Sequence, residues 1–358
     1  QESYFGNRSY DIYHKSTYAN LLFNSIFSNT KHKYKVGINL ASDQYDETIE
    51  VNQVERTDRS VGTFFEYSYD SLEKLSMVLG VRFDHHNHIG SFVTPRAHFR
   101  YAFSDESSLR FSMGSGRRVV AVFAENQKLF ASSRTIQTPN IQYQHFGLRP
   151  EYAWNYGLSF LKGFQIGTTP VNLNADLFRT EFVNQVVVDW ETQGQVSFYN
   201  LDGDSFANSF QLGLNARLFR FIDARFAYKW YDVQVDYSHG LLQKPMQPKQ
   251  RFFTNWGYAG TKWRADITYQ FTGKQRIPPS SSNPNGLESD TFGLLNAQIT
   301  YLPLVNFELY VGTENANNYQ QSNPIQSANN PFSPTFDTSL VYAPVFGRMV
   351  YAGLRYTL

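Results

Sequence analysis

The chain has 358 residues, no cysteine and a formal net charge of +1, from 32 Lys and Arg against 31 Asp and Glu. The lack of cysteine excludes disulfides, thiolate nucleophiles and Cys-ligated metals. The balanced charge argues against a protein that binds nucleic acid by neutralising phosphates. No stretch approaches the ~20 consecutive apolar residues of a membrane helix, and no charged-then-apolar signal segment opens the chain at Gln1.

Alternation of apolar and polar residues is the main pattern along the chain. Between Lys262 and Thr272, every second residue from Trp263 to Phe271 is apolar, and the residues between them are polar or charged. Successive side chains of a strand point to opposite faces, so this segment has one apolar wall and one polar wall. The pattern recurs and predicts about fifteen strands, near residues 14–28, 31–43, 60–70, 74–86, 92–103, 106–116, 151–163, 169–190, 205–219, 222–236, 249–260, 262–272, 291–302, 304–315 and 347–358.

The connections between these strands alternate between short and long. Long ones are expected near residues 44–59, 117–150, 191–204, 237–248, 273–290 and 316–346. Short turns on one rim and long loops on the other are typical of an antiparallel transmembrane β-barrel of the outer membrane. A large soluble sandwich or propeller would also alternate, but its strands are mostly ~5–6 residues long. Many strands here match the ~9–11 residues that cross a bilayer at a tilt.

The predicted strand number sets an expectation about completeness. Bacterial barrels have even strand numbers, and an unpaired strand edge is unfavourable in hydrocarbon. About fifteen strands therefore indicate part of a larger barrel. We expect residues 1–358 to form one domain, the C-terminal part of such a barrel, incomplete at its N-terminal side.

The last eight residues, YAGLRYTL, resemble the C-terminal signal that the barrel assembly machinery of the outer membrane reads. Its characteristic positions are filled by Tyr351, Gly353, Tyr356 and Leu358. The usual last residue of that signal is Phe, so Leu358 is a mild departure. An ordinary final strand would show the same alternation and is compatible with this interpretation.

Longer strings resemble the barrel of TonB-dependent outer-membrane receptors, particularly those of Bacteroidetes-type bacteria. They are FVTPRAHFRYAF (Phe92–Phe103), LRFSMGSGRRVVAVFAEN (Leu109–Asn126), LFASSR (Leu129–Arg134), RPEYAWNYGLSF (Arg149–Phe160) and the stretch Asn330–Leu358. The resemblance implies a 22-stranded barrel with an N-terminal plug, and import driven by the TonB–ExbB–ExbD complex. The plug, the TonB box and about seven strands would then lie upstream.

The expected long outer loop from Ala124 to His145 contains the candidate ligand-binding residues. They are Glu125, Asn126, Arg134, Tyr143 and His145. Long loops over a barrel mouth are where such receptors bind ligand. The alternative is a loop that only packs on its neighbours.

Two further groups of residues are of types that can bind metal ions. His85, His86 and His88 are candidate ligands of copper, nickel or zinc, although a polar hairpin tip would contain the same residues. The loop 44–59 is rich in Asp and Glu, which we interpret as a solvated apron rather than a divalent-ion site. No catalytic motif is present, so we expect neither enzymatic activity nor a cofactor.

The sequence thus predicts part of an outer-membrane receptor of a Gram-negative bacterium that actively imports a scarce nutrient. An iron chelate, cobalamin, a metal complex and a glycan all remain open as substrates, and a surface lipoprotein is an allowed partner. The alternative is a passive porin-like or surface-binding barrel, which would need no TonB box or plug. A barrel enzyme would need a Ser/His or Asp/His set at one rim, and no spacing in the chain supports one.

Overall fold

The computed structural model describes residues 2–5, 8–71, 73–219, 221–280 and 286–357. Leu358 of the predicted insertion signal therefore lies outside the described residues. Within the described part, the model contains no helix that is both long and apolar enough to cross a membrane.

One antiparallel sheet of seventeen strands makes up most of the chain. Each of the predicted strands overlaps one strand of this sheet, and β1 (Glu2–Phe5) and β15 (Gly240–Gln243) are short additions. The sheet confirms the all-β prediction. Its long strands are β2 (Arg8–Ile26), β3 (His32–Ile49), β4 (Asn52–Asp70), β5 (Leu75–His86), β6 (Gly90–Ser104), β7 (Ser107–Arg118), β9 (Glu151–Ile166), β10 (Thr169–Asn184), β13 (Ser205–Leu218), β14 (Ile222–Tyr237), β16 (Gln250–Ala259), β17 (Trp263–Thr272), β20 (Phe292–Leu304), β21 (Phe307–Glu314) and β22 (Met349–Tyr356).

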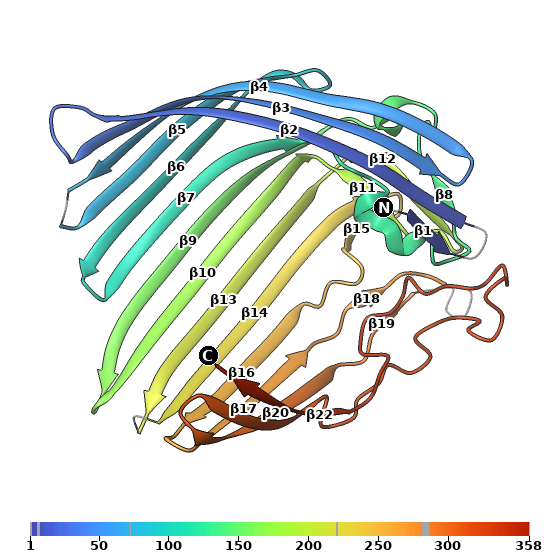
Figure 1. Cartoon of the computed structure of the whole chain (residues 1–358). Coiled ribbons are helices and arrows are strands. Elements are labelled where there is room, and N and C mark those ends of the chain that lie inside the picture. The colour runs from blue at the N-terminus through green and yellow to red at the C-terminus, as the bar shows by residue number, and fades with distance from the viewer. Residues whose placement is uncertain (1, 6–7, 72, 220, 281–285, 358) are drawn as a thin grey trace.

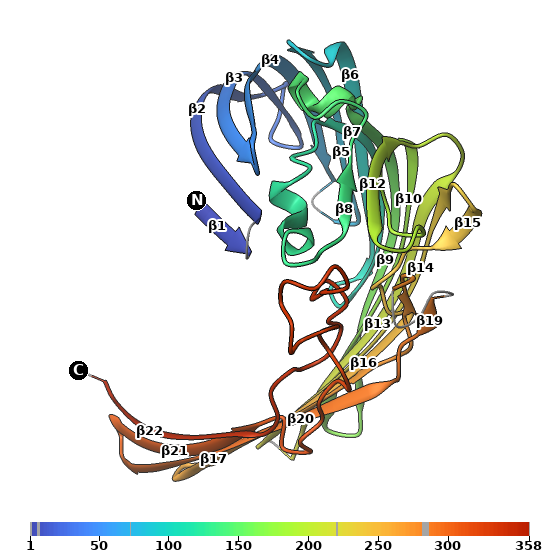
Figure 2. The same cartoon turned by 90° about the vertical axis from the view of Figure 1, so that its right-hand side faces the viewer.

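The sheet curves strongly into a trough that is open between β2 and β22 (Figures 1 and 2). Consecutive long strands pair in chain order, from β2 with β3 to β21 with β22. Among the described residues, β22 pairs only with β21, so the barrel wall is not closed.

The two faces of the sheet differ as the alternation predicts. The convex face carries exposed apolar side chains, for example Leu21 (73% exposed), Ile38 (48%) and Phe83 (50%). An outward apolar band of this kind is what a transmembrane barrel presents to lipid. The concave face is polar, because the residues between these apolar positions are polar or charged.

Ion pairs and hydrogen bonds connect charged and polar side chains within and between strands of the concave face. Arg82 of β5 donates through Nε to Asp84 Oδ2 at 2.6 Å and through Nη2 to Asn39 Oδ1 of β3 at 2.6 Å. On the same face, Glu66 of β4 lies 3.2 Å from Lys35 Nζ and also pairs with Arg96 of β6. The inner wall is therefore a network of paired charges rather than a surface of one sign.

The predicted loop 44–59 is wrong, because β3 and β4 continue through it as a hairpin. Their ladder runs without a break from His32↔Tyr69 to Ile49↔Asn52. The outward residues of this extension are polar, from Ser42 to Thr48 on β3 and from Gln53 to Arg59 on β4, whereas the apolar band begins at Leu40 and Val61. The hairpin therefore rises beyond the membrane band.

The predicted strand 169–190 is also divided. A β-bulge interrupts β10 between Phe182 and Asn184, and the chain leaves the large sheet there. It then forms β11 (Val186–Asp189) and β12 (Gln195–Asn200), which make a small sheet with β8 (Thr135–Gln137). The remaining short elements are the 3₁₀ helices η1 (Ala124–Leu129) and η2 (Gln144–Gly147) and the two-residue strands β18 (Arg276–Ile277) and β19 (Leu287–Glu288).

Candidate functional site

The connection 119–150 between β7 and β9 folds back into the mouth of the trough and carries all five candidate ligand residues (Figure 2). Its Phe123, Phe130 and Phe146 are each 1% exposed. They belong to one buried apolar cluster, the mouth cluster, together with Tyr10, Ile49, Val54, Val122, Leu129, Leu148, Val186, Trp190, Val196, Phe198 and Leu340. Because these residues come from loops and strand ends far apart in the chain, the connection is a packed structure rather than a free loop.

Arg134 joins two of these loops in the buried part of the mouth. Its Nε donates to Asp337 Oδ2 at 2.7 Å, and its Nη2 donates to the Pro279 carbonyl at 2.9 Å. Asp337 Oδ1 in turn accepts the Ser339 N–H at 2.8 Å. Arg134 is 3% exposed and Asp337 is 5% exposed. This charge pair, which we call the loop clasp, gives Arg134 a structural partner.

Glu125 and Asn126 also have partners within the protein. Both oxygens of Glu125 accept hydrogen bonds from Arg118 Nη1 and Nη2, at 3.0 and 3.1 Å. The Nδ2 of Asn126 donates to the Val122 carbonyl at 2.8 Å. These contacts hold η1 against the end of β7, so they favour the packing interpretation for these two residues.

Tyr143 and His145 lie in one short segment but have opposite environments. Tyr143 is 65% exposed, whereas His145 is 5% exposed. His145 and Phe146 both have positive φ, 56° in each case, a conformation that non-glycine residues keep only when the surroundings impose it. Burial of Phe146 in the mouth cluster and the contacts of His145 provide that constraint.

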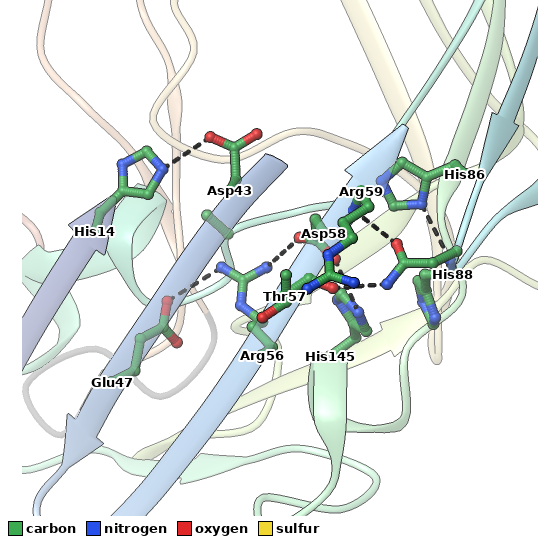
Figure 3. A network of polar contacts seen from close by, with 12 residues as sticks. His14, Asp43, Glu47, Arg56, Thr57, Asp58, Arg59, His86, His88 and His145 are labelled. Atoms are coloured by element: carbon green, nitrogen blue, oxygen red, sulfur yellow. Dashed lines mark hydrogen bonds and ion pairs between the residues drawn. The ribbon is translucent and has the colours of Figure 1, made fainter. Parts of the chain in front are cut away.

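His145 connects η2 to two parts of the barrel wall (Figure 3). Its Nε2 lies 3.2 Å from Asp58 Oδ1 of β4. Its ring stacks on His88, in the β5–β6 turn, with 3.7 Å between ring centroids and an interplanar angle of 17°. His88 Nε2 lies 3.4 Å from the Leu148 carbonyl. We call Asp58, His88 and His145 the histidine contact.

Arg56 extends this network along the β3–β4 hairpin (Figure 3). Its Nη1 donates to Asp58 Oδ2 at 3.1 Å and its Nη2 donates to Glu47 Oε1 at 3.2 Å. The guanidinium lies 3.8 Å from the ring centroid of Tyr45, which stacks on His14. Arg56 is 4% exposed and Glu47 is 1% exposed. The prediction that the acidic residues of segment 44–59 are solvent-exposed is therefore wrong for Glu47 and Asp58, which are buried and paired.

Burial and pairing shift the pKa values of these groups in different directions. Burial raises the pKa of Glu47, although Arg56 opposes it. For Asp58, burial would raise the pKa, but contacts with His145 and then Arg56 outweigh it and hold the pKa below its ordinary value. Burial lowers the pKa of His88, and the neighbouring His145 lowers it further. The neutral imidazole is thus the favoured form of His88 in the folded mouth.

The structure sets His85 apart from the other two histidines proposed as metal ligands, His86 and His88. His85 Nδ1 bonds the Ser91 hydroxyl at 2.9 Å, and its side chain belongs to the outward face of β5. His86 Nδ1 accepts the backbone N–H of His88 at 3.1 Å and that of Ile89 at 3.4 Å. Over the described part of the chain, no group of three or more His, Asp and Glu side chains has an arrangement that would hold a metal ion. His85, His86 and His88 as a metal site therefore stays a prediction without geometric support.

The sequence interpretation missed the partners that complete these contacts, namely Arg56, Asp58 and Asp337. Strand periodicity could have identified the first two, because Val54, Arg56 and Asp58 continue the inward positions of β4. No local pattern marks Asp337, which lies 203 positions from Arg134 in a segment of turn-forming residues.

Residues 351–356 of the predicted insertion signal lie in β22. Tyr351 and Gly353 point to the concave face and Tyr356 to the convex face, following the register with β21. A Cβ atom at Gly353 would overlap the ring of Tyr310, and one at Gly312 would overlap the ring of Tyr351. Each tyrosine thus covers the glycine directly opposite it, at Tyr310↔Gly353 and Gly312↔Tyr351. The structure gives these positions a packing role, and their recognition by the assembly machinery stays a prediction.

The convex apolar band, the polar concave wall and the loops folded into the mouth define part of a membrane β-barrel wall. A sequence model of one family, TonB dependent receptor-like, beta-barrel, matches residues 2–316. The chain belongs to this family. Its members are outer-membrane proteins of Gram-negative bacteria, so this sheet is outer-membrane barrel wall. The narrower resemblance to Bacteroidetes-type receptors stays a prediction.

Solved structures show the same fold at low sequence identity. The siderophore receptor PiuA from Acinetobacter baumannii is 16% identical, with a TM-score of 0.67 over 98% of this chain and 57% of that one. A variant of the ferric enterobactin receptor PfeA from Pseudomonas aeruginosa is 12% identical, with a TM-score of 0.68 over 97% and 54%. The copper transporter OprC is 13% identical, with a TM-score of 0.71 over 98% and 57%. The chain thus spans about half the length of these structures. No curated protein matches it in sequence.

Proposed function

We propose that this chain is the C-terminal part of the barrel of a receptor that actively imports a scarce nutrient, with energy supplied through TonB. The observation that carries the proposal is family membership over residues 2–316, and the loops packed into the mouth of the trough agree with it. A passive pore needs an open path, whereas these loops are held by the loop clasp and the histidine contact.

The proposal includes the rest of the receptor. Upstream strands that complete a 22-stranded barrel, a plug and a TonB box would supply closure and energy coupling. The relatives are named as receptors for siderophores and ferric enterobactin and as a copper transporter. We therefore place iron chelates and metal complexes first among the substrates, ahead of cobalamin and glycans. A surface lipoprotein is retained as a partner, and a catalytic role is not proposed.

The test is uptake by cells that express the receptor from its complete native gene. A panel of labelled iron chelates, copper complexes, cobalamin and oligosaccharides would be supplied at submicromolar concentration, with and without a proton uncoupler and in a strain that lacks TonB. We expect uptake of one class, abolished by the uncoupler and by loss of TonB. Uptake that persists in both conditions would instead establish the passive porin-like alternative.

A further inference from the structure

A small pocket opens on the concave side of the mouth, between η1, β11 and the chain that follows β15. Its volume is about 130 Å³. Val235 and Tyr237 form its base and belong to the inward positions of β14, which places the pocket away from the lipid-facing band. Apart from its two lysines, the remaining lining is polar only at Gln185 and Asn126 and is otherwise apolar, from Val186, Val187, Val188, Trp190, Pro245 and Met246.

Two lysines line this pocket from different elements. Lys128 is the penultimate residue of η1, and Lys244 follows β15. The Lys128 ammonium lies 4.8 Å from the ring centroid of Trp190. Among the described residues neither lysine forms an ion pair. Burial lowers the pKa of Lys128, the like charge of the nearby Lys244 lowers it further, and the negative charge of Asp337 opposes both.

The carboxylates of the surrounding elements are engaged elsewhere. Glu191 receives two hydrogen bonds from Arg276, at 2.8 and 2.6 Å. Asp337 is held by Arg134 in the loop clasp. Asp189 Oδ2 accepts hydrogen bonds from two neighbouring hydroxyl groups, at 2.6 and 3.1 Å. Neither lysine therefore has an ion-pair partner among these acids, although Asp337 is near enough to favour the charged form of Lys128.

A third polar side chain, Gln185, also lines the pocket. Gln185 Oε1 accepts the Ser205 hydroxyl at 2.6 Å, which leaves its amide N–H groups as donors at a pocket-lining position. An oxyanion between two ammonium groups and an amide would make charge-assisted hydrogen bonds and remove the repulsion between the lysines. The pocket is smaller than the ~300 Å³ at which ligand pockets begin, so it fits one charged group rather than a whole ligand.

We propose that this pocket binds one small oxyanionic group, a carboxylate or a phosphate, carried by a solute that enters the mouth. Import of this solute rests on the proposed function. Binding of the anion in the pocket does not depend on that function. The concave position assigns the anion to a soluble molecule rather than to a lipid headgroup.

The experiment is isothermal titration of the receptor, purified in detergent from its complete native gene, with inorganic phosphate and separately with acetate at low ionic strength. We expect saturable binding of at least one anion, weakened about fivefold or more by Lys128→Gln and likewise by Lys244→Gln. The matched control is Lys274→Gln, which removes an exposed lysine paired with Glu288 at 3.2 Å and should leave binding unchanged.

Folding of each variant is checked by the change in its gel mobility when the sample is heated. Because the two lysines lie on separate elements, one variant still tests the proposal if the other misfolds. Absence of saturable binding, or equal binding by wild type and both variants, would overturn the proposal. Displacement of phosphate by lipopolysaccharide micelles would overturn the assignment to a soluble molecule. Energised uptake without anion binding would refute the pocket alone, and anion binding without energised uptake would refute the proposed function alone.

Discussion

Arg134 illustrates how much one buried charge pair can contribute in the mouth. Removing one partner of a buried pair leaves the other charge without compensation, at a cost of about 3–5 kcal/mol. We therefore predict that Arg134→Ala releases the segment around Asp337 and makes connection 119–150 accessible to protease. Limited proteolysis of the detergent-purified receptor, followed by mass spectrometry of the fragments, measures this.

The control for the loop clasp is Arg179→Ala. Arg179 pairs with Glu181 at 2.8 Å, but the two side chains are 44% and 48% exposed, so this change should cost only about 0–1 kcal/mol. Equal protease resistance of Arg134→Ala and wild type would show that the clasp does not hold the loops.

The histidine contact makes the mouth sensitive to pH. The pKa of His88 is lower in the folded protein than its ordinary value of 6.5, so the unfolded segment binds more protons in that range. Stability from this residue is therefore present above pH ~6.5 and is lost as the pH falls below it.

We predict that hydrogen exchange of residues 144–148 accelerates between about pH 6.5 and pH 5, after correction for intrinsic rates. His88→Phe keeps a ring for stacking but cannot be protonated, so it should reduce this dependence, and His86, whose pKa burial also lowers, accounts for what remains. His85→Phe, in the same turn but on the outward face, should leave it unchanged. An identical pH profile for wild type and His88→Phe would contradict the assignment.

These residues mark the limit of sequence reasoning about the site. The segment 124–145 was correctly predicted to lie over the mouth, because a long connection between long strands has few other places to go. Strand periodicity could have placed Asp58 on the inward face, but its pairing with His145, like that of Asp337 with Arg134, depends on the curvature of the sheet. Their charge predicted that Glu47 and Asp58 are exposed to solvent. In the structure both are buried, because the buried Arg56 lies between them and pairs with each.

The hairpin β21–β22 shows how glycine positions are set by neighbouring strands. Gly312 and Gly353 leave room for the tyrosine directly opposite each of them, and the rings of Tyr310 and Tyr351 lie 6.3 Å apart in a T-shaped arrangement. The pair packs across the concave face of the last hairpin.

We predict that Gly353→Ala displaces the Tyr310 ring and destabilises this edge by about 1–3 kcal/mol. The matched control is Gly116→Ala in β7, where an added Cβ would meet no atom within 4 Å. The measurement is the folded fraction of the receptor in gel electrophoresis as the sample is heated. If both variants lose the folded band at the same temperature, the tyrosine does not restrict Gly353.

For the secondary-structure elements, the sequence predicted the strands better than the connections between them. Period-two alternation is a direct consequence of strand geometry, and it located the large sheet from β2 to β22. The alternation did not reveal that β3 and β4 continue beyond the membrane band, because the outward residues of this extension are polar, as the residues of a loop are. It also failed at the bulge in β10, because Val186 and Val187 continue an apolar pattern while the backbone enters another sheet.

For the whole molecule, the burial pattern reverses that of a water-soluble protein. The large sheet exposes apolar side chains on its convex face, and its largest group of buried apolar residues is the mouth cluster. The overall antiparallel wall followed from alternation, strand length and connection length together. The position of the mouth cluster could not be predicted from the sequence. The cluster assembles from segments that come together only because the whole wall is curved.

The mouth cluster also has a consequence for engineering and for divergence among receptors. Connection 119–150, the β11–β12 segment and the loop that contains Leu340 and Asp337 share one apolar interior and one charge pair. Exchanging one of them alone between receptors would place mismatched shapes and an uncompensated charge in that interior. The transferable unit is therefore the full set of mouth segments, and chimeras that change specificity should be built by grafting them together.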